Sequence, residues 1–117
     1  MRAIIVEDEF LAAIHAETAL ERLGIEVVGT AADSAGALAL ADENPQLALV
    51  DLNLRDGFTG PHVGSHLERK GISVVFVTAN PQQLEGWNEM QAPVLEKPLE
   101  EPKLTQAVQQ LMTRIKR

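Results

Sequence analysis

The sequence predicts an α/β protein in which five strand–helix units build a parallel sheet covered by helices. Three observations predict this fold class. Short apolar runs alternate with helical stretches along the whole chain, a pattern typical of parallel sheets. Two of these runs, Leu47–Val50 and Ser73–Val77, are almost wholly apolar, as expected of central strands buried on both faces. The last stretch of the chain repeats apolar residues at helical spacing.

Each strand is expected where a short apolar run leads into a polar residue or a turn. In chain order the expected strands are Ala3–Val6, Ile25–Gly29, Leu47–Val50, Ser73–Val77 and Pro93–Leu95. The fifth run is the shortest and suits the edge of a sheet.

The helices are expected between these strands, and capping or turn residues set their limits. They are Glu9–Leu23, a helix from Asp33 or Ser34 to about Asn44, Gly60–Lys70, Gln82–Met90, and a last helix that begins around Pro102. Gly24 and Gly71 suit the position after a helix end, and Asp33 or Ser34 suits a helix start. The helix over Gln82–Met90, which carries Trp87, has the weakest pattern. The last helix has the clearest apolar face, formed by Leu104, Ala107, Val108, Leu111, Met112 and Ile115.

The composition excludes several classes of protein. A net charge of −7 argues against direct nucleic-acid binding, which needs a basic surface to neutralise phosphates. No apolar stretch approaches the roughly 20 residues that span a bilayer. The absence of cysteine excludes disulfides and thiolate metal sites, and it favours a reducing compartment. We expect a single domain over residues 1–117.

Polar side chains gather where four of the predicted strands end. Glu7 and Asp8 follow the first strand, Asp51 follows the third, Thr78 follows the fourth and Lys97 follows the fifth. Because the carboxyl ends of parallel strands share one edge, where ligands bind in such folds, these five side chains are expected to meet in one cleft.

The three carboxylates predict a metal site. Like charges at close range repel one another unless a cation joins them. Oxygen ligands suit Mg²⁺, with Mn²⁺ as a substitute, and Mg²⁺ binds through few carboxylates together with water and substrate phosphate oxygens. We expect Asp8 and Asp51 to ligate the ion, Glu7 to act largely through water, and the backbone carbonyl of Asn53 to complete the protein ligands.

Asp51 is the residue expected to carry the chemistry. A carboxylate at the end of a buried strand is held rigidly enough for in-line attack on phosphorus. The Thr78 hydroxyl can donate to a phosphoryl oxygen, and the Lys97 ammonium can balance the charge of that group. The bond between Lys97 and Pro98 can be cis, which would aim the lysine inward. The arrangement suits transfer of a phosphoryl group to Asp51.

This combination of residues resembles the receiver domain of bacterial two-component response regulators, the CheY-like family, over the whole length of the chain. The matching residues are Glu7-Asp8, the phospho-acceptor Asp51, the hydroxyl Thr78 and the pair Lys97-Pro98. Three segments are also similar to the receiver half of the alphaproteobacterial PhyR-type stress regulators: Val6–Glu9, Asp51–Gly57 and Phe76–Pro81.

The resemblance implies a sheet in the order 2-1-3-4-5 flanked by five helices, in a cytoplasmic single-domain regulator without an output domain. It implies that Asp51 accepts a phosphoryl group from a sensor histidine kinase in a Mg²⁺-dependent step and later loses it by hydrolysis. The protein would then act through an unknown downstream protein or drain phosphate from the kinase, and it would not be an enzyme beyond its own phosphotransfer and dephosphorylation. Phe10, Leu11 and Ile14 of the first helix are the expected kinase contacts.

Two other functions stay open on the sequence alone. A phosphohydrolase of the haloacid-dehalogenase type also uses a strand-end Asp, but it needs a second Asp two residues later, where this chain has Asn53. The second open function is a docking module that keeps the fold but acts without phosphorylation. The presence of all five cleft residues argues against it.

Overall fold

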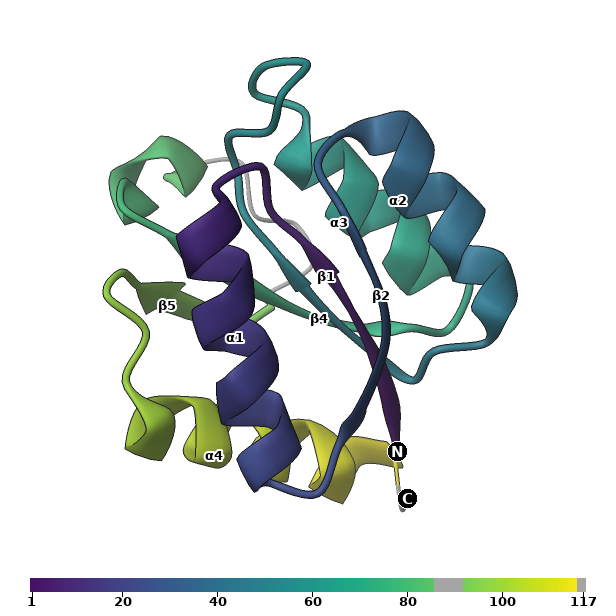
Figure 1. Ribbon diagram of the computed structural model, residues 1–117, viewed down its shortest axis with the longest axis vertical. Coiled ribbons are helices and arrows are strands. Elements are labelled where there is room, and N and C mark those ends of the chain that lie inside the picture. The colour runs from purple at the N-terminus through teal and green to yellow at the C-terminus, as the bar shows by residue number, and fades with distance from the viewer. Residues whose placement is uncertain (86–91, 116–117) are drawn as a thin grey trace.

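The computed structural model describes residues 1–85 and 92–115, and the side chains up to residue 113. Its centre is a parallel sheet of five strands in the order β2-β1-β3-β4-β5 (Figure 1). The strands are β1 (Arg2–Val6), β2 (Glu26–Ala31), β3 (Leu47–Val50), β4 (Ser73–Thr78) and β5 (Val94–Glu96). The predicted fold class and strand order are therefore confirmed, with strand limits shifted by one or two residues.

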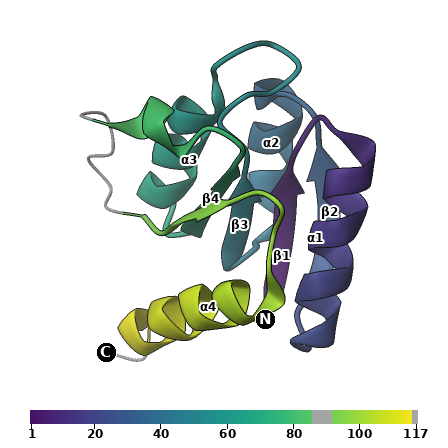
Figure 2. The same cartoon turned by 90° about the vertical axis from the view of Figure 1, so that its left-hand side faces the viewer.

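Two helices cover each face of the sheet among the described residues. Their bounds are α1 (Phe10–Arg22), α2 (Ser34–Leu40), α3 (Gly60–Arg69) and α4 (Glu101–Ile115). Helices α1 and α4 lie on one face, and α2 and α3 lie on the other (Figures 1 and 2). The sheet is thus a buried middle layer, which explains why β3 and β4 are apolar throughout.

Alternate residues of the central strands feed two separate cores, because successive side chains of a strand point to opposite faces. Ile5, Leu49 and Val77 pack toward α1 and α4. Val50 and Phe76 pack toward α2 and α3. Each of these five side chains is at most 8% exposed, so both faces of the sheet are closely packed.

The predicted turn and capping residues at helix ends are largely confirmed. The Asp33 side chain accepts a hydrogen bond from the Gly36 amide and caps α2. Gly24 and Gly71 have φ values of +79° and +85°, which only glycine adopts readily. The helix expected to reach Asn44 is shorter, because α2 ends at Leu40 and a 3-10 helix follows over Ala41–Glu43.

One member of the expected apolar face of the last helix is misplaced. Leu104, Ala107, Val108 and Leu111 are buried, but Met112 is 37% exposed and lies at the margin of that face. The side chain of Ile115 lies outside the described part of the structure.

The helix expected over Gln82–Met90 is described only at its start. A 3-10 helix, η2 (Pro81–Leu84), occupies the first residues, so the α-helical prediction is wrong there. The rest of the expected helix, with Trp87, lies outside the described residues. The structure therefore has four α-helices within ranges 1–85 and 92–115, whereas the sequence predicted five.

None of the helices within the described ranges is long and apolar enough to cross a membrane.

Candidate functional site

Backbone hydrogen bonds at the carboxyl edge of the sheet fix the positions of the candidate site residues. The Asp51 amide donates to the Val6 carbonyl at 2.9 Å, which ties the end of β3 to the end of β1. The Lys97 amide donates to the Thr78 carbonyl at 2.9 Å, which ties the end of β5 to the end of β4. The side chains that follow these strands therefore start from a rigid common edge.

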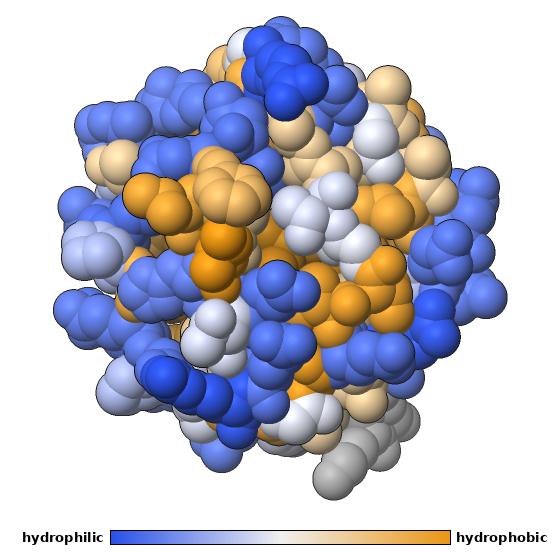
Figure 3. All heavy atoms as spheres, in the orientation of Figure 1, coloured by the Kyte–Doolittle hydropathy of each residue, from blue (hydrophilic) through white to orange (hydrophobic). Residues whose placement is uncertain are grey.

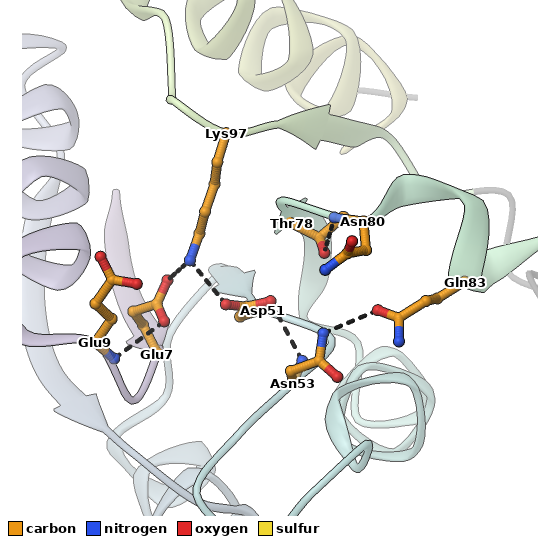
Figure 4. A network of polar contacts seen from close by, with 8 residues as sticks. All are labelled: Glu7, Glu9, Asp51, Asn53, Thr78, Asn80, Gln83 and Lys97. Carbon is orange, nitrogen blue, oxygen red and sulfur yellow. Dashed lines mark hydrogen bonds and ion pairs between the residues drawn. The ribbon is translucent and has the colours of Figure 1, made fainter.

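Lys97 joins two carboxylates from different strands. Its Nζ lies 2.6 Å from Glu7 Oε1 and 2.8 Å from Asp51 Oδ2. Glu7 and Asp51 are 8% and 7% exposed, so both ion pairs are largely shielded from water. Figure 4 shows the lysine reaching down from β5 into the acidic cleft. The structure thus brings together three of the predicted residues.

The acidic residues also meet as the sequence suggests. Glu7, Asp8 and Asp51 each offer a carboxylate oxygen, and these oxygens lie within 4.8 Å of one another. Asp8 is exposed, whereas the other two are buried. Three carboxylates against one nearby ammonium leave the cluster net negative, and oxygen donors of this kind suit a divalent hard cation. The donor set therefore fits Mg²⁺ or Mn²⁺.

Burial and the neighbouring charges together shift the pKa of Glu7. Burial raises the pKa of Glu7 to about 7 from 4.5, and the negative charge of Asp51 adds to the rise. Hydrogen bonds from Lys97 and from the Glu9 amide oppose that rise without cancelling it. For Lys97, burial alone would lower the pKa, but the hydrogen bonds and attraction to Asp51 and Glu7 outweigh burial and leave its pKa raised.

The raised pKa of Glu7 predicts a pH-dependent stability of the metal-free protein. A carboxyl whose folded-state pKa lies above its unfolded value stabilises the fold fully below about pH 4.5, and that contribution is lost as the pH rises through about 7. In EDTA, the free energy of unfolding should fall across this range by at most about 3 kcal/mol from this group. Urea denaturation of wild type and Glu7→Gln checks the prediction, because the variant should show a flatter pH profile. Equal slopes would contradict it.

Asp51 and Thr78 make further contacts in the cleft. Asp51 Oδ1 accepts a hydrogen bond from the Asn53 amide at 3.3 Å. Thr78 is fully buried, and its Oγ1 accepts a hydrogen bond from the Asn80 amide at 3.0 Å. The threonine lies across the cleft from Lys97 (Figure 4). Its hydroxyl hydrogen can still be donated.

One residue of this network has no sequence signal. Gln83 of η2 accepts a hydrogen bond at Oε1 from Asn53 Nδ2, at 2.8 Å. The two residues are 30 positions apart, and Gln83 is one of two adjacent glutamines in a weakly patterned stretch. Only the three-dimensional arrangement of the loops after β3 and β4 reveals the pair.

Gly60 allows the close approach of α3 to Asp51. A Cβ at this position would lie 1.9 Å from the Asp51 carbonyl oxygen and 2.6 Å from Leu52 Cα. The Gly60 amide donates to the Leu52 carbonyl at 3.0 Å. The start of α3 therefore lies directly against the backbone of Asp51, where no side chain fits.

An apolar cavity of about 410 Å³ opens beside the cleft, between α1 and the connection from β5 to α4. Its apolar lining includes Ile5, Leu49, Val77, Leu11, Ala16 and Leu99. Glu7, Asp51 and Lys97 line its polar end. The cleft that holds Asp51 thus adjoins a surface that is mostly apolar.

Comparison with known protein families decides the family. Residues 3–109 match the response regulator receiver domain, which accounts for most of the chain. The chain belongs to the receiver domain family. The sequence-based resemblance to two-component response regulators is thereby confirmed.

Relatives of this receiver domain include PhyR-type proteins. Phyllosphere-induced regulator PhyR of Methylorubrum extorquens is 33% identical over 113 residues, which cover 93% of this chain and 42% of PhyR. The chain therefore spans less than half the length of that curated relative. The receiver domain of Erythrobacter litoralis PhyR is 30% identical with a TM-score of 0.86, and the match covers 96% of this chain and 89% of that one. SdrG of Sphingomonas melonis is 34% identical with a TM-score of 0.82, over 96% of both chains.

Receiver domains are signalling modules of two-component systems, which places this chain among regulatory proteins rather than metabolic enzymes. The PhyR matches agree with the narrower resemblance found in the sequence.

Proposed function

We propose that this receiver domain accepts a phosphoryl group on Asp51 from a sensor histidine kinase in a Mg²⁺-dependent step. The observation that carries the proposal is the placement of Asp51: a largely buried carboxylate bound by Lys97 at 2.8 Å and grouped with Glu7 and Asp8. Glu7 shares the lysine contact and the cluster, but Asp51 follows β3, the strand that pairs with β4 and its Thr78, whereas Glu7 follows β1.

The transfer step uses the acceptor and its neighbours in distinct ways. An Asp51 carboxylate oxygen attacks phosphorus, the bond between phosphorus and the kinase histidine breaks, and the histidine leaves with the bonding electrons. Lys97 offers its ammonium to the charge that the new acyl phosphate brings. Thr78, buried on the opposite side, has a hydroxyl hydrogen to donate to a phosphoryl oxygen.

The metal would be held by Asp8 and Asp51, with the Asn53 carbonyl as a further protein ligand. Burial raises the pKa of Glu7, and its Oε1 lies 2.6 Å from Lys97 Nζ, which favours an indirect role for Glu7 through water. When bound, the cation neutralises charge on the cleft and on the incoming phosphoryl oxygens.

The kinase surface is proposed to centre on the start of α1. Phe10 and Leu11 are 75% and 74% exposed, and Ile14 is 43% exposed. Figure 3 shows apolar side chains gathered over this part of the molecule. The patch adjoins the apolar cavity, whose lining includes Leu11 and whose polar end is formed by Asp51 and its partners. A helical partner that covers this patch would bring its histidine to the acceptor.

The downstream step is proposed to be a protein contact or the removal of phosphate from the kinase. A net charge of −7 does not favour contact with nucleic acid. A related protein, PhyR from Bartonella quintana, is an anti-anti-sigma factor. That activity belongs to a chain about twice as long, since this receiver covers 50% of it. A cytoplasmic location stays a prediction.

The direct test is phosphorylation of the purified protein by acetyl phosphate and Mg²⁺, followed by intact-mass and peptide analysis. One phosphoryl group should appear on the peptide that contains Asp51, and EDTA should prevent its appearance. Absence of incorporation from acetyl phosphate and from a panel of histidine kinases would favour a phosphorylation-independent docking module. Steady turnover of small phosphate esters would instead indicate a phosphohydrolase.

Asp8→Ala should weaken Mg²⁺ binding by about tenfold or more, which corresponds to roughly 1.4 kcal/mol of lost binding free energy. Asp8 is exposed, so the fold should persist, and the metal-free form should be as stable as wild type or more so because repulsion is relieved. Isothermal titration with Mg²⁺ measures the change. Glu9→Ala removes a neighbouring exposed acid outside the cluster and should bind Mg²⁺ nearly as wild type does. Equal affinities for both variants would place the metal elsewhere.

A further inference from the structure

A side-chain hydrogen bond lies along one side of the cleft that holds Asp51 (Figure 4). Asn53, two residues after the acceptor, donates from Nδ2 to Gln83 Oε1 at 2.8 Å. In the described ranges, no other hydrogen bond joins residues 52–59 to residues 79–85. Among the described residues a single hydrogen bond thus joins the loop after β3 to the turn after β4, beside the buried packing of Leu84 in the same core cluster as Leu52 and Leu54.

The other side of Asp51 is closed by ion pairs. Lys97 lies 2.8 Å from Asp51 and 2.6 Å from Glu7. In Figure 4 the Lys97–Glu7 pair lies to one side of Asp51 and the Asn53–Gln83 pair lies to the other. Asp51 is only 7% exposed, so little of its side chain is open to solvent.

The two closures differ in strength. The ion pairs of Lys97 are shielded from water and involve charged groups at short distance. The Asn53–Gln83 bond is exposed and joins two neutral amides, so it is the weaker of the two and the one that opens more readily. Asn53 is anchored on its backbone side by the hydrogen bond from its amide to Asp51, which leaves Gln83 to fix its side chain.

We propose that Gln83 is a positioning residue that holds the Asn53 carboxamide across the mouth of the cleft and restricts the access of small molecules to Asp51. The inference rests on the proposed phosphorylation of Asp51. It concerns two reactions that require such access. In phosphorylation by acetyl phosphate, an Asp51 oxygen bonds to phosphorus and acetate leaves with the electrons of the broken bond. In hydrolysis, a water oxygen bonds to phosphorus, the bond to Asp51 breaks, inorganic phosphate leaves and a proton passes to solvent.

If Gln83 limits the access of small molecules to Asp51, replacing it should change the rates of phosphorylation and of hydrolysis in the same direction. Gln83→Leu keeps the size of the side chain but removes the acceptor oxygen, so both the rate of phosphorylation by acetyl phosphate and the rate of hydrolysis should rise. We expect each to rise about three- to tenfold, the range that loss of one neutral hydrogen bond allows. Mg²⁺ affinity should not change. A variant that merely disordered the cleft would bind Mg²⁺ more weakly and be phosphorylated more slowly.

Three further variants separate this role from a general effect. Gln82→Leu changes the neighbouring exposed glutamine of η2, which makes no side-chain hydrogen bond among those found, and should leave both rates as in wild type. Gln83→Glu keeps an oxygen that accepts from Asn53 Nδ2, so the lifetime of the acyl phosphate should return toward the wild-type value. Combining Gln83→Leu with Asn53→Ala should accelerate hydrolysis no more than Asn53→Ala alone.

The experiment follows acyl-phosphate formation and decay by Phos-tag gels at saturating Mg²⁺, with circular dichroism to verify folding. Gln83→Ala is measured beside Gln83→Leu, so that an effect of the added apolar surface is recognised. Rates for both variants that equal those of Gln82→Leu, or that fall below wild type, would overturn the inference while leaving phosphorylation of Asp51 established. Absence of phosphorylation in the wild type would overturn the proposed function, and the inference with it.

Discussion

Asp51→Asn is expected to reduce phosphate incorporation to background, roughly a thousandfold or more below wild type. The carboxamide lacks the negative oxygen that attacks phosphorus, and it contributes no charge to the metal cluster. Intact-mass analysis after incubation with acetyl phosphate and Mg²⁺ measures the loss. Wild-type incorporation in this variant would show that another residue is the acceptor.

The fold should survive this substitution, which makes the result interpretable. Lys97 keeps its ion pair with Glu7 at 2.6 Å, so no buried charge is left without a partner. Asp42→Asn is a suitable control, because the Asp42 side chain is 84% exposed and lies outside the acidic cluster. Its phosphorylation should match that of wild type.

Gly60→Ala is expected to be the most disruptive single-methyl change near the site. The new Cβ would lie 1.9 Å from the Asp51 carbonyl oxygen, and backbone atoms cannot move aside as a flexible side chain can. Relief requires a shift of the start of α3 away from the acceptor, at a cost of about 1–3 kcal/mol in the free energy of unfolding, or more. Phosphorylation should slow as well, since the acceptor backbone moves with the helix.

Urea denaturation and acetyl-phosphate kinetics on the same variant test both parts. Ser65→Ala places a methyl-sized side chain on the same helix at a half-buried position and should change stability by less than about 0.5 kcal/mol. If Gly60→Ala were as stable and as readily phosphorylated as Ser65→Ala, the close contact of α3 with Asp51 would contribute measurably neither to the free energy of unfolding nor to the rate of phosphorylation.

The sheet could be predicted because each central strand is encoded in a few adjacent residues. Leu47–Val50 and Ser73–Val77 are continuous apolar runs, and burial on both faces leaves them few alternatives. The convergence of Glu7, Asp51 and Lys97 follows from the same pattern, since each residue directly follows a strand of one parallel sheet. Glycine and aspartate marked the helix ends for equally local reasons.

Contacts that depend on loop conformation could not be predicted. Gln83 meets Asn53 only because the turn after β4 bends back over the loop after β3, and nothing in either segment encodes its partner. The early end of α2 at Leu40 escaped prediction because Ala41–Glu43 continues in a tighter helical form with a similar sequence pattern. The close fit of Gly60 against Asp51 is likewise a property of the packed helix and not of its sequence.

The position of Lys97 also has a consequence for the edge of the sheet. Strand β5 is only three residues long and, among the described residues, pairs with β4 alone, so its ladder offers little resistance to local opening. Lys97 directly follows this strand and reaches across β4 to carboxylates at the ends of β1 and β3. The ion pairs of Lys97 therefore stabilise the position of β5, an edge strand with a short backbone ladder. A change in the charge of the cleft is therefore expected to alter how often β5 opens, and hydrogen exchange of the β5 amides would report a change at Asp51, two strands away.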